Sequence, residues 1–148
     1  MPQVSLENAI MRLVVVDDSK PFQRSLTRLL STVDGITIVG YAEDLETARR
    51  VIDESNPEIV VLDAELRGGD RGIDVLRLVA REHPSIQVVA LSNLDWQASR
   101  RSYLDAGAAA YFDKSMEFEQ ARDWIAARAR SAAERGDGDQ DGVGPGRV

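Results

Sequence analysis

The chain has no cysteine, a single histidine and no apolar run close to the roughly 18 residues that a membrane-spanning helix requires. The absence of cysteine excludes disulfides, thiol catalysis and cysteine-based metal sites. The amino terminus also lacks the basic stretch and apolar core of a secretory signal. We therefore expect a cytoplasmic protein that has no membrane partner.

Positive charge is scarce as well, because 18 lysines and arginines face 25 aspartates and glutamates and the net charge is −7. Residues 136–148 hold three aspartates and one arginine, so the rest of the chain carries −5. An acidic body disfavours contact with the phosphates of DNA or RNA. It favours a bound cation or a basic protein partner, and we expect no direct nucleic-acid binding.

Short β-branched runs alternate with segments of helical periodicity along most of the chain. The runs predict strands at Leu13–Val16, Ile36–Val39, Ile59–Asp63, Ile86–Leu91 and Ala109–Phe112. The periodic segments predict helices after Ser19, from Asp44 to Glu54, from Ile73 to Arg81, from Leu94 to Ala106 and from Met116 to about Glu134. This alternation predicts an α/β fold, a doubly wound five-stranded parallel sheet of order 2-1-3-4-5 with five helices.

The composition changes at both ends of this pattern. Residues 1–10 show no period and are predicted to be a flexible lead-in, whereas residues 11–135 form one folded domain. Residues 136–148 contain five glycines, one proline and three aspartates, with almost nothing to bury. We therefore predict that residues 136–148 are a disordered tail.

Polar side chains follow four of the predicted strands at the point where each strand ends. They are Asp17 and Asp18, Asp63, Ser92 and Lys114. The carboxyl ends of parallel strands share one edge of the sheet, so we expect these side chains to converge. Clustered carboxylates raise one another's pKa unless a cation is present, and oxygen ligands without histidine or cysteine favour Mg²⁺.

The same cluster predicts phosphoryl chemistry. A carboxylate can act as a nucleophile and form an aspartyl phosphate, and a hydroxyl and an ammonium can then bind the phosphoryl oxygens. Taken singly, each residue has a simpler explanation. A strand-end aspartate or serine usually caps a turn or helix, and a lone lysine is usually solvated. The combination of residue types, each after its own strand, carries the prediction.

Four motifs extend the pattern: Val14-Val15-Val16-Asp17-Asp18, Val60-Val61-Leu62-Asp63, Val89-Ala90-Leu91-Ser92 and Tyr111-Phe112-Asp113-Lys114. In order and separation they resemble the receiver domain of bacterial response regulators, the CheY-like superfamily, over roughly Arg12 to Arg130. The resemblance implies a phosphoprotein of a two-component system that receives its phosphoryl group from a sensor histidine kinase or a phosphotransfer protein.

The resemblance also implies a role for individual residues. Asp63 is expected to be the phosphoacceptor and a metal ligand, Asp18 a direct Mg²⁺ ligand and Asp17 a ligand through water. The backbone carbonyl of Glu65 is expected to complete the metal site, and its side chain is expected to matter little.

Ser92 and Lys114 are expected to bind the phosphoryl group and so to belong, with Asp63, to the catalytic set. Tyr111 resembles the aromatic residue that turns inward when the hydroxyl residue moves, so Ser92 and Tyr111 form the expected switch. The simpler explanation of Tyr111 is a strand aromatic at the edge of the core.

Two positions depart from the family pattern. Receivers commonly have a proline four residues and a glycine eight residues after the phosphoacceptor, whereas this chain has Arg67 and Gly72. The loop is therefore expected to be one residue longer, which affects phosphate lifetime and kinase fit. Ser115 replaces the family's proline after the lysine, so a cis bond is not assumed there.

The leading hypothesis is a phosphorylation-controlled binding module that turns over no external substrate. Its output is expected through a protein-binding face made by the fourth helix, fifth strand and fifth helix, with a phosphorylation-linked dimer as one form. Alternatives are a Mg²⁺-dependent aspartyl-phosphate phosphatase, a constitutive scaffold, and a fragment of a longer DNA-binding response regulator.

Overall fold

A computed structural model describes residues 10–66, 71–93 and 97–143 of the chain, without the side chains of Gln97 and residues 135–143. The predicted lead-in, apart from Ile10, lies outside the described residues. So do Arg67, the predicted loop residues 68–70 and the start of the predicted fourth helix at Leu94.

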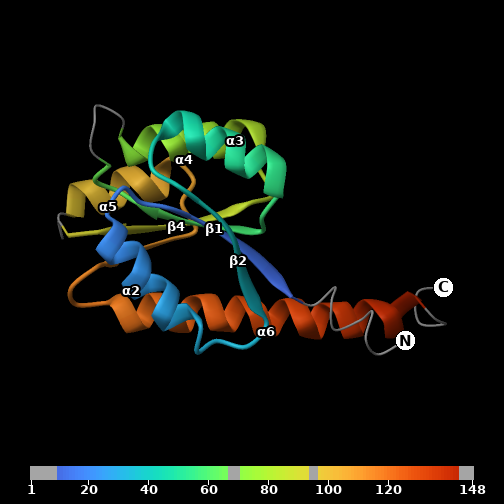
Figure 1. Ribbon diagram of the computed structural model, residues 1–148. Coiled ribbons are helices and arrows are strands. Elements are labelled where there is room, and N and C mark those ends of the chain that lie inside the picture. Colours follow the sequence, from blue (N-terminus) through green and yellow to red (C-terminus); the bar gives the residue numbers. More distant parts are fainter. Residues whose placement is uncertain (1–9, 67–70, 94–96, 144–148) are drawn as a thin grey trace.

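Five parallel strands form one sheet in the order β2-β1-β3-β4-β5, which confirms the predicted fold (Figure 1). The strands are β1 Met11–Val16, β2 Ile36–Ala42, β3 Ile59–Asp63, β4 Gln87–Ser92 and β5 Ala110–Asp113. Because β1 and β3 are central, every residue of β3 is buried, and so is every residue of β1 except Arg12. Burial on both faces explains why these strands are continuous apolar runs instead of alternating ones.

Helices cover both faces of the sheet (Figure 1). They are α2 Lys20–Leu30, α3 Leu45–Ser55, α4 Gly72–Glu82, α5 Gln97–Asp105 and α6 Phe118–Val143. Helices α3, α4 and α5 lie on one face, and α2 and α6 lie on the other. Alternate residues of each strand therefore face different helices: Val14 and Val16 belong to the first layer, and Leu13 and Val15 to the second.

Local signals fix the starts of the first two helices. The hydroxyl of Ser19 accepts a hydrogen bond from the backbone N–H of Phe22 at 3.3 Å, and Pro21 follows in the first turn, where its missing N–H has no cost. Asp44 caps α3 by accepting from the N–H of Thr47 at 2.8 Å. Asn56 ends α3 in the left-handed region, at φ 50°.

The observed elements differ from the predicted ones mainly in length. Strand β2 continues to Ala42 because β1 pairs with it along its whole length, across an irregularity after Leu13. Helix α6 continues to Val143, whereas the sequence predicted an end near Glu134 and a disordered tail from Gly136. The glycines of that segment still disfavour a stable helix, and disorder there stays a prediction.

Two further observations concern helix length and peptide-bond geometry. No described helix is long and apolar enough to cross a membrane. The described residues contain no cis peptide bond, so the bond between Lys114 and Ser115 is trans.

Candidate functional site

The carboxyl edge of the sheet brings the predicted polar residues together. Asp17 and Asp18 follow β1, Asp63 ends β3, Ser92 ends β4 and Lys114 follows β5. A cavity of about 380 Å³ opens at this edge. Its lining residues are Asp18, Ser19, Phe22, Asp63, Glu65, Asn93, Lys114 and Ser115.

Three carboxylates form the acidic part of the site. One oxygen from each of Asp17, Asp18 and Asp63 lies within 4.8 Å of the others. Asp17 is 2% exposed and Asp63 is 5% exposed. Burial raises the pKa of both carboxyls above the ordinary value, and for Asp17 the charge of Asp63 raises it further. Buried carboxylates that repel one another are the donor set that suits a hard divalent cation.

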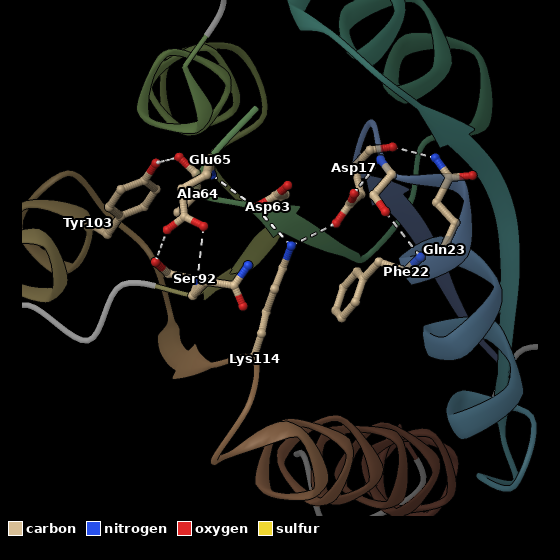
Figure 2. Close-up of polar contacts among 11 residues, drawn as sticks. Asp17, Phe22, Gln23, Asp63, Ala64, Glu65, Ser92, Tyr103 and Lys114 are labelled. Carbon is tan, nitrogen blue, oxygen red and sulfur yellow. Dashed lines mark hydrogen bonds and ion pairs between the residues drawn. The ribbon is translucent and has the colours of Figure 1, made fainter. Parts of the chain in front are cut away.

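The ammonium of Lys114 lies between two of these carboxylates (Figure 2). Its Nζ is 3.1 Å from Asp63 Oδ1 and 3.3 Å from Asp17 Oδ2, and both contacts oppose the upward pKa shifts. The same Nζ lies 4.1 Å from the centre of the Phe22 ring, a cation–π contact. Lys114 is therefore held as a fixed positive charge beside Asp63.

Hydrogen bonds from α2 fix the loop that carries Asp17. The backbone N–H of Ser19 donates to Asp17 Oδ1 at 2.7 Å. The side-chain amide of Gln23, 7% exposed, donates to the backbone carbonyl of Asp17. Ser19, the N-cap of α2, therefore positions the carboxylate of Asp17, and Gln23 of α2 positions its backbone.

Glu65 contributes its side chain to the site, which the sequence did not predict. Ser92 Oγ donates to Glu65 Oε2, and the backbone N–H of Asn93 donates to Glu65 Oε1 at 3.1 Å (Figure 2). The backbone N–H of Glu65 in turn donates to Asp63 Oδ1 at 2.9 Å. The register offers the signal: Asp63 pairs with Leu91, so the residues after Asp63 lie level with Ser92 and Asn93. The metal-binding role of the Glu65 carbonyl stays a prediction.

The backbone just after Asp63 is tightly packed against α4 and α5. A Cβ on Gly72 would lie 2.5 Å from the carbonyl oxygen of Asp63 and 2.7 Å from Tyr103 Oη, so only glycine fits there. Tyr103 Oη donates to the carbonyl of Ala64 at 3.1 Å. Burial raises the pKa of the Tyr103 hydroxyl, which therefore stays protonated as a donor.

Tyr111 lies away from the carboxylates but is connected to them through Tyr103. Its ring is 3% exposed and lies 5.5 Å, centre to centre, from the ring of Tyr103. Its hydroxyl lies 3.0 Å from Ser99 Oγ, and the guanidinium of Arg100 donates to its backbone carbonyl at 2.8 Å. The structure therefore gives Tyr111 an inward position, and its role as a switch stays a prediction.

Sequence reasoning missed the supporting residues Phe22, Gln23, Tyr103 and Arg100 because each acts through tertiary contacts. Phe22 and Gln23 lie in the first turns of α2, close to Asp17 in sequence. For Tyr103 and Arg100, the sequence offers no indication of a role in the site beyond their place on α5.

Comparisons with known proteins agree with this geometry. The sequence model of the response regulator receiver domain matches residues 13–126. The response regulator GacA of Pseudomonas viridiflava is 33% identical over 105 residues, covering 71% of this chain and 49% of that protein. A protein-glutamate methylesterase/protein-glutamine glutaminase of Burkholderia thailandensis is 38% identical over 101 residues, covering 67% of this chain and 28% of that protein. The chain thus spans about half the length of GacA and less of the esterase.

Solved structures show the same architecture. The response regulator domain of Thermotoga maritima CheB has a TM-score of 0.70 at 25% identity, covering 84% of this chain and 97% of that one. A LuxR-family two-component response regulator from Aurantimonas sp. SI85-9A1 has a TM-score of 0.73 at 26% identity, covering 88% and 98%.

Proposed function

Because the chain belongs to the response regulator receiver family, we propose that it accepts a phosphoryl group on Asp63 from a sensor histidine kinase or a phosphotransfer protein. The observation that carries the proposal is the position of Asp63. Asp63 is 5% exposed and lines the cavity beside Asp18, and its carboxylate lies 3.1 Å from the ammonium of Lys114.

The chemistry follows from these contacts. A carboxylate oxygen of Asp63 forms a bond to phosphorus while the bond from phosphorus to the donor's imidazole nitrogen breaks. The nitrogen leaves with the electron pair and takes up a proton. Lys114 stabilises the negative charge on the transferred oxygens, and Phe22 keeps the ammonium in place. The domain thereby modifies only itself, and we propose that it turns over no external substrate.

Mg²⁺ is the cation that the donor set fits. Asp17, Asp18 and Asp63 supply only oxygen ligands, and burial raises the pKa values of Asp17 and Asp63, which favours a cation beside them. When bound, Mg²⁺ would neutralise charge on the carboxylates and phosphoryl oxygens. The ion pairs of Lys114 with Asp17 and Asp63 already neutralise part of the carboxylate charge.

The phosphatase alternative has less support. Such enzymes usually carry a second catalytic carboxylate two residues after the nucleophile. In this chain Glu65 occupies that position. Both oxygens of Glu65 accept hydrogen bonds from the end of β4, through Ser92 and the N–H of Asn93. In the unphosphorylated chain this carboxylate is directed at the end of β4 and not toward a leaving group on Asp63.

We further propose that the output is a protein-binding face formed by α5, β5 and α6. Leu104 on α5 and Met116, just before α6, are exposed by 43% and 81%. Arg100 connects the elements of this face, because it donates to the carbonyl of Tyr111 and pairs with Glu117 at 3.3 Å. A shift of Tyr111 would therefore be passed to Arg100 and Glu117. The net charge of −7 favours a protein partner over DNA.

Phosphorylation with a small phosphodonor tests the proposed function. Incubation with acetyl phosphate and Mg²⁺ should add one phosphoryl group per chain, measured by intact mass, and Asp63→Asn should abolish the addition. The matched control is Asp34→Asn, which makes the same chemical change at an exposed aspartate before β2, outside the cavity. Labelling of Asp63→Asn at the normal rate would contradict the proposal.

A further inference from the structure

The carboxylate of Glu65 occupies the place beside Ser92 that an oxygen of a phosphoryl group on Asp63 would need. Ser92 is fully buried, and its hydroxyl donates to Glu65 Oε2. The backbone N–H of Asn93 donates to Glu65 Oε1 at 3.1 Å, so the carboxylate bridges two donors at the end of β4 (Figure 2). An anion already satisfies the hydroxyl that is expected to bind the phosphoryl group.

The backbone holds Glu65 in this place. The N–H of Ala64 donates to the carbonyl of Leu91 at 2.8 Å, which continues the pairing of β3 with β4 past Asp63. The N–H of Glu65 donates to Asp63 Oδ1 at 2.9 Å. The side chain of Glu65 therefore starts next to Asp63 and extends to Ser92. A phosphoryl group on Asp63 would lie in the same space between these two residues.

The residues farther along the expected switch are inward in the same structure. Tyr111 is 3% exposed, its hydroxyl lies 3.0 Å from Ser99 Oγ, and its ring contacts Tyr103. Tyr103 Oη donates to the carbonyl of Ala64, the residue that precedes Glu65. The contact between Glu65 and Ser92 and the buried position of Tyr111 thus belong to one connected arrangement.

We propose that Glu65 is an internal stand-in for the phosphoryl group, which holds Ser92 and Tyr111 in their inward positions before phosphorylation. This inference rests on the proposed function, because it requires a phosphoryl group on Asp63. The hydroxyl of Ser92 has one proton to donate and cannot serve two anions at once. Glu65 must therefore leave Ser92 when the phosphoryl group arrives, and the two anions compete.

Two measurable consequences follow. Loss of the Glu65 charge should strengthen binding of a phosphoryl analogue, because no carboxylate then repels it or occupies Ser92. The same change should weaken the hydrogen bond from Ser92, because a neutral acceptor replaces a charged one, and should therefore loosen Ser92 and Tyr111 in the unphosphorylated protein. A phosphoryl analogue should then restore the inward arrangement, so the change on binding should be larger in the variant than in the wild type.

The test is a titration of the full chain with fluoroberyllate in the presence of Mg²⁺, followed by amide NMR. Glu65→Gln keeps the shape of the side chain and removes its charge. We expect it to bind fluoroberyllate about fivefold or more tightly than the wild type. Its free spectrum should differ from the wild-type spectrum at residues 97–111. Glu58→Gln makes the same chemical change at an exposed residue before β3 and should alter neither result.

A double mutant separates competition for Ser92 from simple repulsion. In a Ser92→Ala background the hydroxyl is absent, so Glu65→Gln should improve fluoroberyllate binding by clearly less than in the wild type. An equal improvement in both backgrounds would contradict the inference, because Glu65 would then act only through its charge.

The fluoroberyllate affinities and the free spectra of wild type and Glu65→Gln can each overturn the inference. Equal affinities for wild type and Glu65→Gln overturn the inference but leave the proposed function intact. A higher affinity with an unchanged free spectrum also overturns it, because Glu65 would not be holding the switch. If neither protein binds fluoroberyllate and neither is labelled by acetyl phosphate, the proposed function fails and the inference fails with it.

Discussion

The strands of the sheet begin at one edge, the amino edge, and end at the other, the carboxyl edge. The two ends of β3 show how differently these edges are built. Ile59 begins the strand, is fully buried and packs in an apolar cluster with residues of β1, β4 and α6. Asp63 ends the same strand, is almost as buried and lies among carboxylates. Among the described residues, every buried polar side chain lies at the carboxyl edge or in the helix beside it: Asp17, Gln23, Asp63, Ser92 and Asp113.

This difference indicates that apolar burial at one edge stabilises the fold, while burial of carboxyl groups at the other edge costs stability. Apolar burial at Ile59 involves no titrating group, so its contribution to folding does not depend on pH. Burial of Asp17 and Asp63 raises their pKa values, which means that their ionised forms are less favourable in the folded chain than in the unfolded one. The carboxyl edge therefore favours the proposed cation, whereas the apolar cluster of described residues around Ile59 supplies no side-chain oxygen for one.

The largest effect is expected at the amino edge. Ile59→Ala removes fully buried methyl groups and leaves a cavity, so the free energy of unfolding should fall by about 2 to 5 kcal/mol in urea denaturation. Leu104→Ala is the matched control, because Leu104 is 43% exposed and should change stability little. A loss below about 1 kcal/mol for Ile59→Ala would break the proposed contrast between the edges.

Mg²⁺ should act on the carboxyl edge alone. At about a hundred times its Kd, a ligand that binds only the folded chain raises the free energy of unfolding by about 2.7 kcal/mol. Asp18→Asn should abolish this gain, because it removes a ligand from the carboxylate cluster. Ile59→Ala should retain the full gain from its lower baseline, since distant sites are additive. Urea denaturation of each protein with and without Mg²⁺ measures both effects, and a Mg²⁺ gain in Asp18→Asn would contradict the site.

Neutralising Asp63, the proposed phosphoacceptor, should stabilise the chain in Mg²⁺-free solution. Asp63→Asn keeps an oxygen for the N–H of Glu65 and leaves Lys114 paired with Asp17. It removes an ionised carboxylate whose pKa is raised by burial, so the free energy of unfolding at neutral pH should rise by about 1 kcal/mol. Thermal and urea unfolding check the sign. A decrease would mean that the ion pair with Lys114 outweighs the cost of burying the carboxylate.

The sequence predicted the sheet and the convergence of Asp17, Asp18 and Asp63, because strand order and the carboxyl-edge rule depend on chain pattern alone. It could not predict the packing around them. The cation–π contact of Lys114 with Phe22 and the hydrogen bond from Tyr103 to the carbonyl of Ala64 join residues far apart in the chain. Nothing in the sequence around these residues predicts the contacts. Glu65 lies between these cases, since the register of β3 with β4 places it but its side-chain direction depends on Ser92.

Helix α6 offers the smallest expected effect. Its first half is anchored on the sheet through Ala121, Ile125 and Ala129, which are 2%, 0% and 3% exposed. The last part extends past the sheet on the side where the chain enters β1 (Figure 1). Residues 136–148 contain five glycines and only two apolar side chains, Val143 and Val148.

Glycine costs about 1 kcal/mol in a helix relative to alanine, so this end adds little to folding. Removal of residues 136–148 should change the free energy of unfolding by less than about 0.5 kcal/mol and leave phosphorylation of Asp63 unaltered. Ile125→Ala, in the anchored half, should in contrast cost about 2 to 5 kcal/mol. If truncation lowered stability as much as Ile125→Ala does, the end of α6 would have to be part of the apolar core, and stability would not be concentrated where the helix meets the sheet.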